Sequence, residues 1–244
     1  MDPSPEGAAP RALGPLHRRR LRQIWRSAGW PCQDLIEIEL LACGLLQRQR
    51  DGDGRETLRV TDAGISELAR TLQKNRAARD AHEALVALVA REMQRAGRVV
   101  WRGLSLRTRI GDGDAAAWAI AMPDVFSIRH TTVEDYVEPV AHEIKVRRSD
   151  LLADLRRREK GEAYRQLSSQ CWYVLRAGIG QADEIPDAFG VMQAHDGALE
   201  VLRPAPRRAL KLPFATWMAL ARAAPEPVDD DVQGWLGADD GAAP

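Results

Sequence analysis

The first third of the chain places apolar residues at helical spacing between turn signals. Residues 16–28 and 33–43 each carry one apolar stripe, and Gly44 ends the second stripe as a C-cap glycine. Two short runs flank Asp51-Gly52-Asp53-Gly54, a pattern typical of a β-hairpin turn. Thr61 is an N-cap residue before the next apolar-periodic run, ISELARTL. The pattern predicts helix, helix, hairpin, helix.

The pattern then changes from helix to strand. A polar stretch, residues 73–79, leads into a predicted helix over 80–96. Three strand-like runs, a charged helix and one more apolar run follow, and a final hairpin turns around His195-Asp196-Gly197. Helix, three strands, helix, strand is a compact α/β order. The predicted strands cover residues 98–110, 115–130, 137–146 and 171–175.

The order of the first elements resembles a winged-helix domain over about residues 15–73. The segment GLLQRQRDGDGRETLRVTDAG is similar to the wing of many bacterial regulators. The resemblance implies either DNA binding or protein docking. Only about 20 residues separate the starts of the first two helices, so a full three-helix reader is not obvious and both roles stay open.

Composition sets the class of protein. Of 244 residues, 45% are apolar and 29% are charged, as in a soluble globular protein. The sequence contains no run of about 18 apolar residues, the length needed to span a membrane. Its N-terminus lacks the apolar core of a signal peptide. Three scattered cysteines are too few for a disulfide framework or a zinc site. We therefore expect a reduced, cytoplasmic protein.

The formal net charge of zero hides an uneven distribution of charge. Residues 226–244 contain six acids and no Lys or Arg, which leaves a net charge of +6 on residues 1–225. A basic body with an acidic extension suits a protein that meets phosphate, and a solubilising tail on a neutral surface is the alternative. The predicted organisation is a disordered segment 1–14, a winged-helix-like domain 15–76, an α/β domain 79–225 and a disordered acidic tail 226–244.

Candidate chemistry lies in two strands, about 124–130 and 136–146. If they form a hairpin centred between residues 133 and 134, Asp124 lies opposite Glu143, with Cβ atoms about 5 Å apart. Lys145 shares the face of Glu143, because residues two apart in a strand point the same way. Two carboxylates at that distance hold a cation between them, and oxygen ligands suit Mg²⁺ or Mn²⁺. With the Ile144 carbonyl as a further ligand and Lys145 assisting, this predicts metal-assisted phosphodiester hydrolysis.

The residues Pro123-Asp124 and Glu143-Ile144-Lys145 match the signature of the PD-(D/E)XK nuclease superfamily. Over about residues 98–212 the chain resembles the MmcB-like DNA-repair proteins of that superfamily, whose other features correspond here to Ser149 to Asp154, to Lys160 with Tyr164, and to the hairpin GVMQAHDGALEVLRPAP. The resemblance implies a restriction-endonuclease-like mixed sheet flanked by helices. Extra residues stand between Asp154 and Lys160, where the chain departs from the family. The alternative is a strand-start Asp and an exposed Glu–Lys pair on a solvated sheet face.

Other residues could support such a site, each with a plainer alternative. Glu83 could be an additional metal ligand from a helix, or a charge at a helix N-terminus, and Glu92 competes for that role. Gln166 and Gln170 could contact DNA or lie on a solvated helix face. Basic residues near the site could bind DNA phosphates or form a charged helix face. They are Arg147, Arg148, Arg156, Arg157, Arg158 and Lys160, with Tyr164 as a further candidate DNA contact.

Two predictions concern packing. His142 adjoins Glu143 but is expected to face the core as a packed histidine. Trp101, Trp118 and Trp172 are expected in the core, which leaves one of the seven tryptophans to stack on a base without indicating which.

The function predicted from the sequence is a Mg²⁺- or Mn²⁺-dependent deoxyribonuclease in DNA repair or defence, acting on single- or double-stranded DNA. One alternative is a nuclease fold that only binds DNA or a protein. Another is a winged-helix transcription regulator. The oligomeric state is left open, and a protein partner could dock on the winged-helix-like domain.

Overall fold

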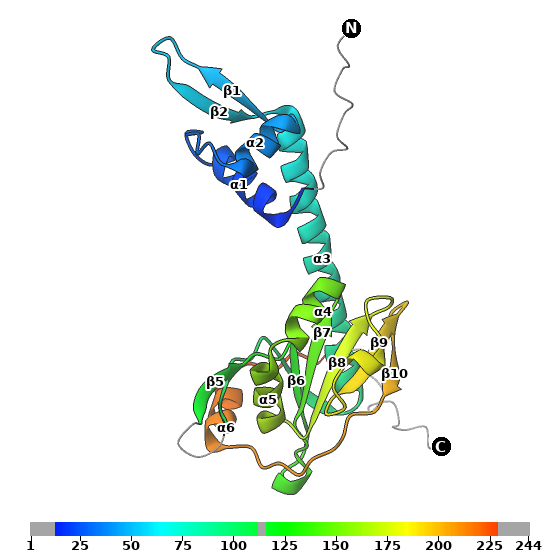
Figure 1. The fold of residues 1–244 in the computed structure, drawn as a ribbon. Helices are drawn as coiled ribbons and strands as arrows, with labels where there is room; N and C mark the ends of the chain where they lie inside the picture. Colours follow the sequence, from blue (N-terminus) through cyan, green and yellow to red (C-terminus); the bar gives the residue numbers. More distant parts are fainter. Residues whose placement is uncertain (1–12, 112–115, 229–244) are drawn as a thin grey trace, which may run out of the picture. The chain divides into compact units, whose positions relative to one another are not determined.

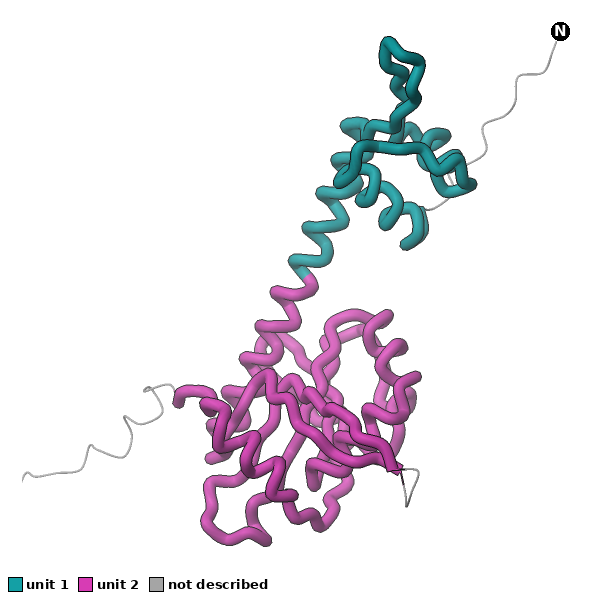
Figure 2. The backbone as a smooth tube through the Cα atoms, turned by 90° about the vertical axis from the view of Figure 1, so that its left-hand side faces the viewer, with its two compact units in different colours: residues 1–77 teal, residues 78–244 magenta. Residues whose placement is uncertain are grey.

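The computed structural model describes residues 13–111 and 116–228 of the chain, which divides into two compact units, residues 1–77 and 78–244 (Figure 2). The division falls inside one helix, α3 (Asp62–Arg95). Two helices separated by a polar stretch were predicted here, and that prediction is wrong. Residues 73–79 contain neither Gly nor Pro, so nothing in the backbone interrupts the helix. None of the described helices is long and apolar enough to cross a membrane.

The first unit has the predicted order of elements: two helices, a hairpin and the start of α3. Asp34 begins the second helix, because its side chain accepts a hydrogen bond from the Glu37 amide at 2.9 Å. Gly29 lies between the first two helices with φ +76, and a Cβ there would overlap the Leu58 carbonyl oxygen. The elements are α1 (Pro15–Trp25), α2 (Leu35–Ala42), β1 (Leu46–Arg50) and β2 (Glu56–Val60). Their core contains Leu21, Ile24, Leu40, Leu45, Leu46, Leu58 and Leu68.

The second unit is built on a mixed six-stranded sheet with helices on both sides (Figure 1). Its order is β10-β9-β8-β7-β6-β3, parallel from β7 to β9 and antiparallel at both ends. The unit also contains a separate two-stranded sheet β4-β5, 3₁₀ turns at Glu134–Tyr136 and Ala182–Glu184, and a C-terminal helix that was not predicted. The strands are β3 (Arg98–Arg102), β4 (Leu106–Ile110), β5 (Ala117–Ala121), β6 (Val125–Arg129), β7 (Val140–Lys145), β8 (Gln170–Arg176), β9 (Gly190–His195) and β10 (Ala198–Arg203), and the helices are α4 (Arg148–Leu155), α5 (Arg158–Leu167) and α6 (Phe214–Arg222).

The central strands β7 and β8 of this sheet are buried on both faces, as expected where parallel strands are covered by helices. Alternate residues of β7 and β8 belong to two separate cores. One core contains Leu85, Val86 and Val89 of α3, and the other contains Leu151 of α4 and Leu167 of α5. The central strand β7 is therefore buried along its whole length, and any polar residue on it lies between a helix and the sheet.

Each of the first two predicted strands is in fact two strands. Arg98 pairs with Arg129 and Leu106 pairs with Ala121, so one register continues through β3-β6 and β4-β5. Between the two ladders the pairing stops at residues 103–105 on one strand and 122–124 on the other. Gly103, with φ +65, and Pro123 stand in the gap, and proline has no amide hydrogen to donate to a ladder. The sheet therefore opens immediately before β6.

The predicted final hairpin is present as β9-β10, with His195 paired with Ala198. Asp196 and Gly197 both have positive φ, as a two-residue type I′ turn requires. The predicted tail is partly wrong: Glu226 is anchored to the second unit, its amide donating to the Val100 carbonyl at 2.7 Å and its carboxylate paired with Arg102 at 2.6 Å. The rest of that tail, residues 229–244, and most of the predicted disordered N-terminus, residues 1–12, lie outside the described residues.

His142 is 1% exposed, which confirms the prediction of a packed histidine. Burial, and then the charge of Arg98, lower the pKa of His142 from 6.5 to about 3. The unfolded chain binds a proton below pH 6.5 while the folded chain does not, so stability is lost as the pH falls toward 3. Relative to a His142→Leu variant, we expect wild-type stability to fall by about 1.4 kcal/mol per pH unit below 6.5. Urea unfolding of both proteins between pH 7 and 5 measures this difference, and parallel curves would contradict it.

Candidate active site

Asp124 lies where the ladder opens, one residue before β6. The adjacent pair is Val125 with His142, so the register continues to Asp124 opposite Glu143. The Asp124 Oδ2 atom accepts a hydrogen bond from the Ile144 amide at 2.7 Å. The carboxylate therefore takes the place of the strand partner that Ile144 would otherwise have on this side.

The register predicted for the two strands is correct, although the predicted hairpin connection between them is not. They are shorter than predicted, and the segment between them contains a 3₁₀ turn, Glu134–Tyr136, instead of a tight hairpin. The register agrees nevertheless, because a one-residue shift would move every side chain of β7 to the opposite face of the sheet. Asp124, Glu143 and Lys145 are therefore brought together as the sequence predicted.

Glu143 is 5% exposed, and both of its carboxylate oxygens are hydrogen-bonded. Lys145 and Lys160 each donate to Oε1, the latter at 2.5 Å. The Tyr164 hydroxyl lies 2.7 Å from both Glu143 Oε2 and the Met122 carbonyl oxygen, which lies in the gap between the ladders. Burial, and then the charge of Glu143, raise the pKa of Tyr164, so its hydroxyl keeps its proton. Two residues of α5 thus fix the Glu143 carboxylate.

A further carboxylate, Asp154 of α4, shares the two lysines. Its Oδ1 atom lies 2.6 Å from Lys160 Nζ and 3.5 Å from Lys145 Nζ, and its Oδ2 accepts from the Tyr173 hydroxyl at 2.8 Å. Burial alone would raise the pKa of Asp154, but the hydrogen bond from Lys160 and the charges of both lysines outweigh burial and lower it. Glu143 and Asp154 also raise the pKa of Lys160 against its own burial. The result is a buried network of two carboxylates and two ammonium groups.

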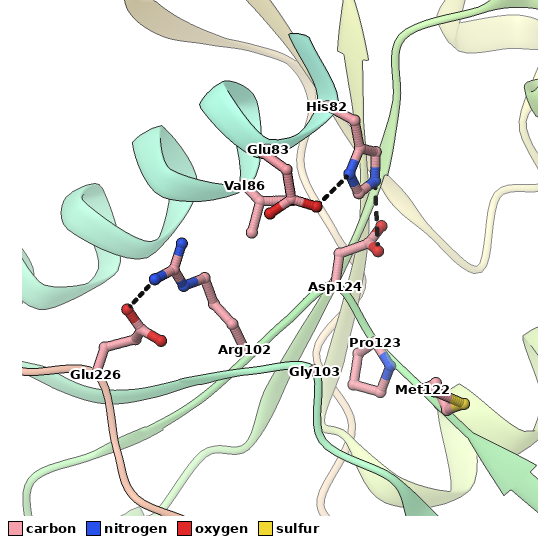
Figure 3. Close-up of a pocket in the computed structure, with 9 residues that line it drawn as sticks. All are labelled: His82, Glu83, Val86, Arg102, Gly103, Met122, Pro123, Asp124 and Glu226. Atoms are coloured by element: carbon pink, nitrogen blue, oxygen red, sulfur yellow. Dashed lines mark ion pairs between the residues drawn. The ribbon is translucent and has the colours of Figure 1, made fainter. Parts of the chain in front are cut away.

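Asp124 opens into a pocket of about 420 Å³ at the side of α3 (Figure 3). His82 Nε2 lies 3.4 Å from Asp124 Oδ1, and His82 Nδ1 lies 3.6 Å from a carboxylate oxygen of Glu83. Burial, and then the charge of Glu143, raise the pKa of Asp124, and the Ile144 amide and His82 oppose this. In the register that continues from Val125 and His142, Asp124 lies opposite Glu143, and directly opposed residues have Cβ atoms about 5 Å apart.

The other predicted site residues lie in varied places. Glu83 lines the pocket of Asp124, and its side chain is 65% exposed. Arg148 is held by Glu184 at 2.6 Å and by the Ile179 carbonyl at 3.2 Å. Gln166 is exposed on α5, and Arg147 precedes α4. Lys160 and Tyr164 are both bonded to Glu143; the Tyr164 side chain is buried, whereas the Lys160 side chain is 25% exposed.

The prediction that Trp118 lies in the core is wrong: its side chain is 65% exposed, whereas Trp101 and Trp172 are buried. Sequence reasoning also missed His82 and Tyr173, and it named Asp154 only as the end of a feature of the resemblance. His82 stands directly before Glu83 in the first turn of the helix predicted over 80–96, so the position that singled out Glu83 could have singled out His82 as well. No local pattern predicts the contact of Asp154 with Tyr173, because that contact depends on how α4 packs on β8.

Within the described residues, no three His, Cys, Asp or Glu side chains form a group that could hold a metal ion. The set predicted from the sequence, Asp124, Glu143 and the Ile144 carbonyl, has only two such side chains. Its oxygen atoms nevertheless fit a hard cation such as Mg²⁺, which keeps several waters and takes one or two carboxylates. In a strand, the amide and carbonyl of one residue face the same neighbour, so the Ile144 carbonyl lies on the side of β7 toward Asp124.

Comparison with known proteins adds little. No family model matches the sequence, and no curated protein matches it. Among solved structures, the chain is similar to the SPO1766 protein of unknown function from Silicibacter pomeroyi, with 19% identity and a TM-score of 0.39 over 55% of this chain and 77% of that chain. Similarity at that level supports no conclusion about fold or function.

Proposed function

We propose that this protein is a Mg²⁺- or Mn²⁺-dependent phosphodiesterase that cleaves DNA, with a role in DNA repair or defence, and that its second unit is a PD-(D/E)XK nuclease domain. The observation that carries the proposal is the placement of Asp124 at the opening of the sheet, bonded to the Ile144 amide between Glu143 and Lys145. The mixed sheet supports it, since β3, β6 and β7 are antiparallel and β8 is parallel to β7 across α4 and α5. The first unit, with its helix–helix–hairpin–helix order, is proposed as a winged-helix-like module that binds DNA or a protein.

In this proposal Asp124, Glu143 and the Ile144 carbonyl hold the metal ion. When bound, the ion supplies a Lewis acid at the scissile phosphate. Tyr164 keeps Glu143 in place through Oε2, leaving Oε1 to the ammonium groups. Asp124 Oδ1 is open to the pocket beside His82, while Oδ2 is fixed by the Ile144 amide.

Lys145 is the residue proposed to act on the substrate. Lys145 is 9% exposed, and its ammonium group contacts Glu143. Because water is largely excluded there, the ammonium group would strongly stabilise negative charge on a phosphate oxygen. Asp154 lies 3.5 Å from Lys145 Nζ and restricts its position. The Lys145 side chain is therefore already oriented in the folded protein and need not move to contact a phosphate.

One observation favours a second candidate, a nuclease fold that binds DNA without cleaving it. Both oxygens of Glu143 already have partners, two of which are lysines. Two ammonium groups at one carboxylate take the place that a cation would occupy, so a metal ion would have to compete with them.

Incubation with end-labelled single- and double-stranded DNA in Mg²⁺, Mn²⁺ or EDTA separates the two candidates. We expect cleavage with either ion and none in EDTA. Calorimetric titration of Mn²⁺ is expected to give binding heat with wild type and none with Asp124→Ala. Equal heats from both proteins would contradict the metal site, and DNA binding without cleavage in any of the three conditions would favour the binding candidate.

A further inference from the structure

A groove of about 710 Å³ lies beside β5, between that strand and the start of α5. Its walls differ in chemistry. One wall carries Trp118 and Ile120 of β5, and the other carries consecutive basic residues from the α4–α5 junction. The residues that line the groove include Trp118, Ile120, Arg156, Arg157, Arg158 and Lys160.

The apolar wall follows from an alternation of large and small residues along β5. The inward side chains are alanines, and Ala121, 1% exposed, packs into the core beneath α5. The outward side chains Trp118, Ile120 and Met122 are 65%, 62% and 59% exposed. Contiguous exposed apolar side chains of this size are unusual on a surface without a binding role.

The basic wall is a run of three exposed arginines, Arg156, Arg157 and Arg158. None of their side chains forms an ion pair or hydrogen bond with another residue in the part of the chain that the structure describes. Glu159 is the acidic residue among those that line the groove. Arg107, opposite Ile120 on β4, adds positive charge 5.2 Å from the Trp118 ring centroid.

An exposed aromatic ring beside unpaired arginines fits a single strand of nucleic acid. Unpaired bases offer a face that stacks on tryptophan, and arginines take the phosphates. A duplex hides the faces of its bases, so it would use the arginines but not the ring. An acidic peptide offers charge but no ring to stack, so it too would leave Trp118 unused.

The groove leads to the candidate active site from two directions. Lys160 lines the groove and contacts Glu143 at 2.5 Å. On the apolar wall, the outward row continues from Ile120 to Met122, which lines the pocket of Asp124. At a rise of about 3.3 Å per residue, Met122 lies about 13 Å along the strand from Trp118. The outward row of β5 thus connects the groove to the pocket of Asp124, and Lys160 connects it to Glu143.

We propose that this groove binds single-stranded DNA, with a base stacked on Trp118 and phosphates on Arg156, Arg157 and Arg158. The choice of DNA rests on the proposed function, and the preference for a single strand rests on the groove alone.

The test measures binding of a fluorescein-labelled 12-mer of thymidine by anisotropy in EDTA, where no cleavage is needed. Trp118→Ala is expected to weaken binding at least about fivefold, the lower end of one base-stacking interaction. Trp118→Phe keeps a stacking face and is expected to retain most of the affinity. Tyr136→Ala removes another exposed aromatic side chain, 61% exposed and outside the groove, and is expected to change nothing.

Salt dependence tests the arginines separately. Replacing Arg156, Arg157 and Arg158 by serine is expected to reduce the slope of log affinity against log salt by about 2, at about 0.7 per phosphate contact. Trp118→Ala is expected to leave that slope unchanged, because stacking releases no counterions. Arg176→Ser, an exposed arginine elsewhere in the second unit, serves as the matched control.

Three results would overturn the inference: affinity within twofold of wild type for Trp118→Ala, an equal loss of affinity for a 12-base-pair duplex, or an unchanged salt slope in the triple variant. Failure of the proposed function is distinct. A protein that never cleaves DNA but loses single-strand affinity with Trp118→Ala keeps the groove and loses the nuclease. A protein that cleaves DNA but binds it independently of Trp118 does the reverse.

Discussion

Replacing Lys145 by methionine is expected to lower the rate of DNA cleavage by about 10²–10³-fold, as for removal of one donor that stabilises transition-state charge. The same change is expected to keep or strengthen Mn²⁺ binding, because Lys145 is not a proposed ligand and one of the two ammonium groups that compete at Glu143 Oε1 is removed. Methionine has nearly the shape of lysine without its charge, so the buried position stays filled. Single-turnover cleavage and calorimetry on the same protein measure the two effects.

The controls for this prediction come from the same chain. Asp124→Asn is expected to lose both cleavage and Mn²⁺ binding, since it removes a proposed ligand. Lys211→Met removes an exposed lysine that pairs with Glu134 at 3.0 Å, and is expected to change neither. A Lys145→Met protein that cleaves DNA at the wild-type rate would show that Lys145 has no part in the reaction.

Replacing Asp154 by alanine is expected to lower the free energy of unfolding by about 3 kcal/mol at pH 7. Removal of one partner from a buried ion pair costs about 3–5 kcal/mol, and the lower value applies because the Lys160 side chain is 25% exposed. The variant leaves two ammonium groups facing Glu143 alone and leaves the Tyr173 hydroxyl without its acceptor. Urea unfolding measures the loss.

The cost of the Asp154→Ala substitution is expected to depend on pH. The pKa of Asp154 is lower in the folded chain than in the unfolded chain, so its contribution is complete above the unfolded value of about 4 and disappears as pH falls through the folded value. The difference between wild type and Asp154→Ala is therefore expected to shrink below about pH 4. Asp150→Ala, at an exposed position of the same helix, is expected to cost less than about 0.5 kcal/mol. Equal costs for the two variants would contradict a stabilising network.

The sequence was most informative where one physical rule decides the outcome. The register of Asp124 against Glu143 could be predicted because a strand with period-two alternation has one arrangement that buries Val140 and Ile144 on the same face. The hairpin at Asp196-Gly197 could be predicted because positive φ at two successive residues favours such a pair.

It was least informative where two opposite causes give the same pattern. Trp118 looked like a core residue because it is large and apolar, but its neighbours Ala117 and Ala119 are small enough to let helix α5 approach from the other side of β5. Residues 73–79 looked like a linker because they are polar, although a solvated helix has the same composition. The partners of Asp154 could not be predicted because α4 and β8 meet only after folding.

The gap beside Asp124 also constrains how related chains can differ in length. Residues 103–105 and 122–124 are equal in number, and the ladders on either side of them keep one register. An insertion of one residue in either segment alone would shift β4 against β5 by one residue, so that the side chains of one strand would no longer share their faces with those of the other. We therefore expect homologous chains to gain or lose residues in these two segments together, so that insertions and deletions there co-vary across an alignment.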